Sequence, residues 1–301
     1  PVTFFQTSEG PEGVSLLPLH PILTDRNLRR IQEVQRRLEM PDLSDAGRTG
    51  ALITLAETFG HLGRWEEAGE ALAEIPEEFA GAGAPMRVWV SLWSGRVDEI
   101  EAELAAVDPA TLVDSPALPA LAKAAKGEWG EGAEIFLQAA RSDQVAAEYG
   151  TYYTLMASAF MRLAGNDQTA DALIEEARAL GEGFDWVSVL VRGMAGESQT
   201  EPVGSNITEI TEAGRVCEQR FYRAFQRDIT PTRQRALLEG CVSTGVVDFV
   251  EYTASLLRLR QLDPERWDPT LAPEPEPVQK EGETEDDDWT SGATPSWSIP
   301  S

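Results

Sequence analysis

A repeated spacing of glycines constrains the fold of this chain more than any other sequence feature. Gly63, Gly95, Gly127, Gly165 and Gly245 are each followed by apolar or small residues five, nine and twelve positions later. From Gly63 to a weaker unit around Gly196, successive units follow at intervals of roughly 31–38 residues, the length of a helical-hairpin repeat. Such a repeat predicts stacked helical hairpins, because one hairpin cannot bury its apolar face alone.

The clearest unit is residues 55–76, with the sequence LAETFGHLGRWEEAGEALAEIP. Three- and four-residue spacing predicts two apolar stripes, namely Leu55, Phe59 and Leu62, and then Ala68, Leu72 and Ile75. Gly63 stands where a C-cap glycine ends a helix, and Pro76 closes the second helix because proline cannot continue one. The small Ala68 allows the two helices to approach closely. The unit therefore predicts a helix–turn–helix hairpin.

This unit resembles the tetratricopeptide repeat (TPR) family. The residues that carry the resemblance are Leu55, Phe59, Gly63, Trp65, Ala68, Leu72, Ile75 and Pro76. The resemblance covers roughly residues 50–180, and 230–260 more loosely. It implies an all-α, TPR-like α-α superhelix, a right-handed solenoid of helical hairpins. Two first helices look short, starting after Pro85 and Pro119, and Asp167 replaces the tryptophan found at positions 65 and 129.

The resemblance also implies a binding surface, since first helices line the concave side of such a solenoid. The candidate partner-binding residues placed there are Glu57, His61, Trp89, Trp93, Arg162 and Trp186. Trp89 and Trp93 share a helix face and suit a peptide or helix partner. The favoured interpretation is nevertheless that they are core residues that compensate for short helices. The Lys and Asn set with which the family grips a peptide carboxylate is missing, which argues against a chaperone-tail receptor.

Composition divides the chain into five segments. We expect an extended apolar arm over 1–24, helical repeats over 25–196, a joint over 197–206, C-terminal hairpins over 207–267 and an acidic tail over 268–301. Phe4 and Phe5 of the arm, and Trp289 and Trp297 of the tail, are further candidates for partner contacts. The tail lacks periodicity and is rich in Pro, Glu, Ser and Gly, which predicts disorder.

The first predicted helix starts after a cap at Thr24 or Asp25. Its apolar stripe is expected to be Leu28, Ile31, Val34 and Leu38. Its arginines, which are Arg26, Arg29, Arg30, Arg36 and Arg37, either contact the acidic repeats or form a solvated capping face.

Near the C-terminus, Cys217 and Cys241 are interpreted as small buried core residues rather than as a bridge or ligand pair. Arg220, Arg223 and Arg227 lie on one face of a predicted helix. That basic row either neutralises the tail or a neighbouring repeat, or it is simply solvated.

The net charge of −26 limits the partners. It concentrates in residues 49–210, where 27 acidic and 9 basic residues give −18, and in residues 268–301, where 9 acidic residues and one lysine give −8. Such a field disfavours nucleic acid. The acidity reflects either solubility and salt adaptation or a basic partner. The sequence shows no secretory segment and no long apolar run, so cytoplasmic is the default location.

The sequence offers little for chemistry. Its two histidines, His20 and His61, are far apart and lack metal-ligand spacing, and no phosphate loop, HExxH or GxSxG motif is present. We therefore expect no catalytic residue, metal or cofactor. The favoured function is a non-enzymatic protein–protein interaction scaffold or assembly subunit. The alternative is an acidic chaperone or charge mimic that shields a basic partner, whose binding would fall steeply with salt.

Overall fold

The computed structural model describes residues 21–143, 145–181, 184–197 and 210–267, and these residues form helices without any strand. The α-helices of the first half are α1 (Pro21–Leu38), α2 (Asp45–His61), α3 (Trp65–Ala73), α4 (Ala80–Ser94), α5 (Ile100–Ala105), α6 (Pro109–Asp114) and α7 (Ala117–Ala125). Those of the second half are α8 (Trp129–Ala140), α9 (Ala147–Leu163), α10 (Asp167–Leu180), α11 (Asp185–Met194), α12 (Ile210–Arg223), α13 (Pro231–Val242), α14 (Val250–Leu262) and α15 (Pro264–Trp267). A short 3₁₀ turn, η1 (Glu77–Phe79), precedes α4. The chain is therefore all-α over the described residues.

The helices pack against their neighbours in sequence, and glycine turns join the two helices of most pairs. Within the described residues, the glycines with positive φ are the six of the sequence repeat: Gly63, Gly95, Gly127, Gly165, Gly196 and Gly245, with φ between 68° and 82°. In five of these turns the residue after the glycine donates its N–H to a carbonyl five residues earlier, as in Arg64 to Phe59 at 3.0 Å. This is the hydrogen bond of a Schellman cap, which L side chains disfavour and glycine permits.

Small residues allow the helices to approach closely. Ala68 of α3 is fully buried against α2. A Cβ atom on Gly60 of α2 would lie 2.6 Å from the ring of Trp93 on α4, so this crossing tolerates only glycine. On α8, a Cβ atom on Gly132 would lie 2.8 Å from the carbonyl oxygen of Ala120 on α7.

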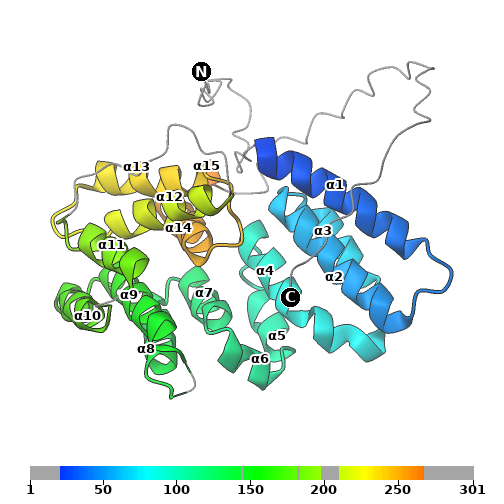
Figure 1. The fold of residues 1–301 in the computed structure, drawn as a ribbon, viewed down its shortest axis with the longest axis horizontal. Helices are drawn as coiled ribbons and strands as arrows, with labels where there is room; N and C mark the ends of the chain where they lie inside the picture. Colours follow the sequence, from blue (N-terminus) through cyan, green and yellow to red (C-terminus); the bar gives the residue numbers. More distant parts are fainter. Residues whose placement is uncertain (1–20, 144, 182–183, 198–209, 268–301) are drawn as a thin grey trace, which may run out of the picture.

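The chain curves back on itself. Figure 1 shows the helices following one another from α1 to α11, after which α12–α15 return toward the middle of the molecule. There α14 packs against α4 and α7 as well as against α12 and α13. One contiguous core runs from α1 to α15.

Helices α1, α4 and α7 begin earlier than the sequence predicts, and each includes a proline. α1 begins at Pro21, before the expected cap at Thr24 or Asp25, because proline is well tolerated in the first helical turn. α4 begins at Ala80 and includes Pro85, and α7 begins at Ala117 and includes Pro119. The prediction that these first helices start after their prolines is therefore wrong.

The apolar stripe of α1 is also only partly as predicted. Ile31 and Val34 are buried, but Leu28 is 43% exposed and the polar Asn27 is buried instead. Arg30 donates to the Glu57 carboxylate at 3.0 Å, so this arginine contacts the acidic repeats.

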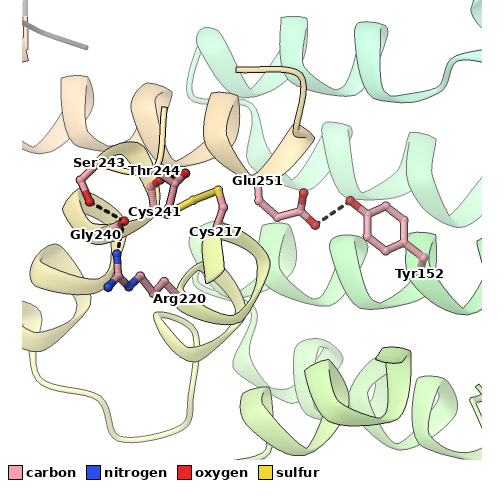
Figure 2. The surroundings of a disulfide bond; sticks show 8 residues. All are labelled: Tyr152, Cys217, Arg220, Gly240, Cys241, Ser243, Thr244 and Glu251. Carbon is pink, nitrogen blue, oxygen red and sulfur yellow. Dashed lines mark hydrogen bonds between the residues drawn. A yellow bond between two sulfur atoms is a disulfide. The ribbon is translucent and has the colours of Figure 1, made fainter. Parts of the chain in front are cut away.

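Cys217 on α12 and Cys241 on α13 are fully buried and form a disulfide (Figure 2). Their burial is as predicted, but the expectation of two unbridged core residues is wrong. Periodicity places each cysteine on the inner side of its own helix and cannot show that the two helices pair.

The basic row on α12 is only partly solvated, because the Arg227 side chain is 75% exposed whereas Arg220 is partly buried. Arg220 donates to the Gly240 carbonyl at 2.6 Å, beside the disulfide (Figure 2). Arg227, just after α12, lies 3.5 Å from a carboxylate oxygen of Asp171 on α10. Among the helices that the structure describes, none is long and apolar enough to cross a membrane.

Candidate interaction surface

The helix α14 covers the side of α4, α7 and α9 that the resemblance assigns to partner binding. We call this side the inner face. Arg260 of α14 donates to the carbonyl of Leu92 at 2.8 Å and also to that of Trp93. Both carbonyls belong to the last turn of α4, where no intrahelical donor remains, and a guanidinium also suits the negative end of the helix dipole. The C-terminal helix therefore caps α4.

Gln261 of α14 makes a similar contact with the C-terminal end of α7. Gln261 donates to the carbonyl of Ala124 in the last turn of α7 at 2.9 Å. Its side-chain oxygen accepts from the Nε1 atom of Trp129 at 2.8 Å. Polar groups of α14 thus contact the C-terminal ends of two first helices. Without α14 the Leu92 and Trp93 carbonyls would lose the Arg260 donor, whereas the Ala124 carbonyl would keep the N–H of Gly127 at 2.9 Å.

The two predicted tryptophans of α4 belong to an aromatic cluster under α14. Trp93 is 3% exposed and donates its indole N–H to Thr253 at 3.2 Å. The ring of Trp89 stacks on that of Trp93 with centroids 5.7 Å apart. The ring centroid of Trp65 lies 6.0 Å from that of Trp93. The alternative interpretation as core residues fits Trp93, because a partner could reach it only after α14 had moved.

Glu57 and His61 lie one turn apart on α2, next to the loop that leads into α14. His61 is 7% exposed, and its Nε2 atom lies 2.5 Å from a carboxylate oxygen of Asp248 in that loop. Glu57 is half-buried and paired with Arg30. The structure thus brings two predicted residues together with Asp248, which the sequence analysis did not select.

Arg162 and Trp186 make contacts within the chain. Arg162 of α9 pairs with Asp167 at 3.2 Å and with Asp171 at 2.6 Å, both on α10. Trp186 of α11 donates to a carboxylate oxygen of Glu218 at 2.8 Å, and the guanidinium of Arg215 lies 5.1 Å from its ring centroid. The remaining candidates, Phe4, Phe5, Trp289 and Trp297, lie outside the described residues.

Glu218, which is partly buried, leads to an acidic pair with the buried Glu251 at the junction of α9, α12 and α14. Glu251 of α14 is fully buried and accepts a hydrogen bond from the hydroxyl of Tyr152 on α9 at 2.6 Å (Figure 2). Burial raises the pKa of Glu251, although the Tyr152 hydrogen bond acts in the opposite direction. Burial and then the Glu251 carboxylate raise the pKa of Glu218 to about 8, against the Trp186 hydrogen bond and Arg215.

These raised pKa values favour one negative charge on the pair over two near neutral pH. An uncharged carboxylic acid is compatible with the enclosed position of Glu251, whereas a second charge would have to be desolvated beside the first. The acidic pair therefore makes the packing of α14 on α9 and α12 sensitive to alkaline pH.

An apolar cleft of about 840 Å³ opens away from α14, between α6, α7, α8 and α9. Its lining includes Leu112, Val113, Pro119, Ile135, Tyr149 and Tyr153. Val113 and Tyr149 are 64% and 61% exposed, so both present apolar surface to solvent beside the cleft. The sequence analysis missed this outer cleft, because Val113 and Tyr149 look like ordinary stripe residues until the neighbouring helices are placed.

One feature of the acidic pair was visible in the sequence. Glu251 interrupts the apolar stretch VVDFVEYTASLLRL, where a charged residue stands out. Glu218 gives no comparable signal, because it lies among other charged residues of α12.

Comparisons of this chain with protein-family models, with curated proteins and with solved structures find no match.

Proposed function

We propose that this chain is a non-enzymatic protein–protein interaction scaffold that binds an apolar, basic-flanked segment of its partner in the outer cleft between α6 and α9. The observation that carries the proposal is the cleft, with Val113 and Tyr149 exposed on its lining. The TPR-like superhelical path is part of the same proposal. It is supported by the stack of sequence-adjacent helix pairs and by the six left-handed glycines at the turns.

The size and lining of the cleft suit a peptide side-chain cluster. Pockets that bind small ligands or side-chain anchors commonly enclose about 300–1,000 Å³ and are mostly apolar with a few polar groups. The outer cleft, at about 840 Å³, falls in that range. Aromatic and aliphatic anchors that enter such a cleft supply most of the affinity of an interface.

The charges around the outer cleft indicate the flanking chemistry of the partner. Asp114 lines the cleft, and Asp143 and Glu148 lie close in sequence to its lining residues Ser142 and Tyr149. With a net charge of −26 on the whole chain, a partner segment with lysine or arginine beside its apolar anchors is favoured over an acidic one.

Selection from a random peptide library on the intact chain tests this function. The proposal predicts peptides with two or more large apolar residues and adjacent basic residues. Their affinity should fall at least tenfold in the double variant Val113→Asp with Tyr149→Ser. The matched control is Leu180→Asp on α10, which changes another exposed apolar residue away from the cleft. Selected peptides that bind the double variant as well as the parent would contradict the proposal.

Salt dependence separates this proposal from the charge-mimic alternative. Binding anchored in the outer cleft should weaken only a few-fold between about 0.05 and about 0.5 M salt. A steep loss, with no effect of the double variant, would favour shielding of a basic partner by charge alone.

The cytoplasmic location stays a prediction, and the disulfide gives a reason to test it. Disulfides persist mainly in oxidising compartments. Mass spectrometry of Cys217 and Cys241 after rapid alkylation of source cells would decide: bridged cysteines would argue against a reducing compartment.

A further inference from the structure

We propose that Glu57, His61 and Asp248 form a divalent transition-metal site that fastens the loop before α14 to α2. Each residue offers one ligand atom, and these three atoms all lie within 4.8 Å of one another. The ligands come from distant parts of the chain, since Glu57 and His61 belong to α2 whereas Asp248 lies between α13 and α14. The site is distinct from the outer cleft and does not depend on the proposed function.

The local structure orients two of the ligands before any metal binds. Glu57 and His61 are four residues apart on α2, so one helical turn places them on the same face. The glycine turn at Gly245 ends α13 and directs the following loop, with Asp248, back toward that face. Ligand atoms around a tetrahedral metal with bonds of about 2.0–2.2 Å lie roughly 3.4 Å apart. The ligand atoms, which lie within 4.8 Å of one another, therefore have to move closer when a metal binds.

The state of His61 is the second observation that points to a ligand. Its Nε2 atom is buried and has no hydrogen-bond partner, although a carboxylate oxygen of Asp248 lies 2.5 Å away, because the direction of approach does not suit an N–H donor. Buried polar atoms are nearly always satisfied. His61 also lines a cavity of about 30 Å³, together with Arg26, Asn27, Arg30 and Asp248 among others, which is room for one small ion or water.

The ligand set indicates the class of metal. One imidazole with two carboxylates suits Zn²⁺ and its neighbours such as Co²⁺, whereas Mg²⁺ and Ca²⁺ prefer sites made only of oxygen atoms. The side chain of Asp248 is 66% exposed, so solvent reaches the site and water can complete the coordination.

Arg30 is the competitor for this site. Its guanidinium pairs with Glu57 at 3.0 Å, so a metal ion has to displace it. The site should therefore bind Zn²⁺ with moderate affinity in the parent chain. Removing the Arg30 charge should strengthen binding, which gives the proposal a test in each direction.

The experiment is a Zn²⁺ titration of the intact chain after treatment with EDTA and removal of the chelator. We expect one saturable Zn²⁺ equivalent by calorimetry and a rise in melting temperature that EDTA reverses. Bound Co²⁺ should give a visible absorption band. Binding should weaken at least tenfold in Asp248→Asn and in His61→Ala. The exposed Asp248 provides the variant that keeps the fold if the buried His61→Ala variant does not.

The matched pair Arg30→Gln and Arg29→Gln tests the competitor. Both remove one positive charge from α1, but only Arg30 contacts a ligand, because Arg29 donates to the carbonyl of Asp25. Affinity for Zn²⁺ should rise at least threefold in Arg30→Gln and change less than twofold in Arg29→Gln. Absence of saturable Zn²⁺ binding, or binding that Asp248→Asn leaves unchanged, would overturn the assignment.

Discussion

Replacing Glu218 by glutamine should stabilise the chain at alkaline pH and have little effect at acidic pH. Glutamine has nearly the same shape, and its carbonyl oxygen can still accept the 2.8 Å hydrogen bond from the indole of Trp186. What it removes is the ionisation of a partly buried acid beside the fully buried Glu251. Trp186 and Arg215 therefore keep their contacts while the charge is lost.

The sign and size of the effect follow from the pKa of Glu218, which is raised from 4.5 to about 8 in the folded chain. A raised pKa means that the folded state holds the proton more tightly than the unfolded state. This contribution to stability is present in full below pH 4.5 and is lost as the pH rises through 8. At about 1.4 kcal/mol per pH unit, the ceiling is roughly 5 kcal/mol. Because the two acids titrate as a pair, we expect about 2–4 kcal/mol.

Urea unfolding at about pH 5 and about pH 9 measures this difference. Glu218→Gln should match the parent within about 1 kcal/mol at the lower pH and exceed it by about 2–4 kcal/mol at the higher pH. The control is Glu134→Gln on α8, where the acid is exposed. Equal effects of the two substitutions at both pH values would refute the argument that Glu218 holds its proton in the folded chain.

Three further predictions concern the packing of the helices. Ala68→Trp should lower the free energy of unfolding by about 1–3 kcal/mol or more, because Ala68 of α3 is fully buried against α2. An unchanged melting temperature would show that the hairpin tolerates a large residue there. Cys217→Ser with Cys241→Ser should cost about 3.5 kcal/mol, the loop-entropy value for a bridge with a sequence separation of 24. A reducing agent should destabilise the parent but not the variant. Arg260→Met should cost about 2–4 kcal/mol, because it leaves the α4 carbonyls uncapped. Hydrogen exchange should become faster in α14 than in α10, and the same change in both helices would contradict a local cap.

The parts of the fold that could be predicted from the sequence are those set by local physics. A glycine that must adopt positive φ after a helix leaves a clear signal, and each glycine of the repeat has that conformation. Apolar periodicity likewise identified the buried side of α12, including Cys217 and Phe221. Proline was a poorer guide, since the first turn of a helix needs no N–H donor and α7 accommodates Pro119 near its start.

The parts that could not be predicted depend on contacts between distant segments. Nothing local to Arg260 or Gln261 shows that they cap helices that lie far earlier in the chain. The disulfide and the cluster of Glu57, His61 and Asp248 are hidden for the same reason. Histidine spacing alone predicts no metal site, because Asp248 joins the cluster only through the return of the chain to α2.

Hydrogen exchange of the intact chain, with and without a selected peptide, tests the central claim most directly. The account predicts that peptide binding protects amides of α6, of α8 and of the first half of α9, around Val113 and Tyr149, and leaves α14 unchanged. Protection of α2 and α4 together with faster exchange in α14 would contradict it, because that result would mean that the partner displaces α14 and binds the inner face.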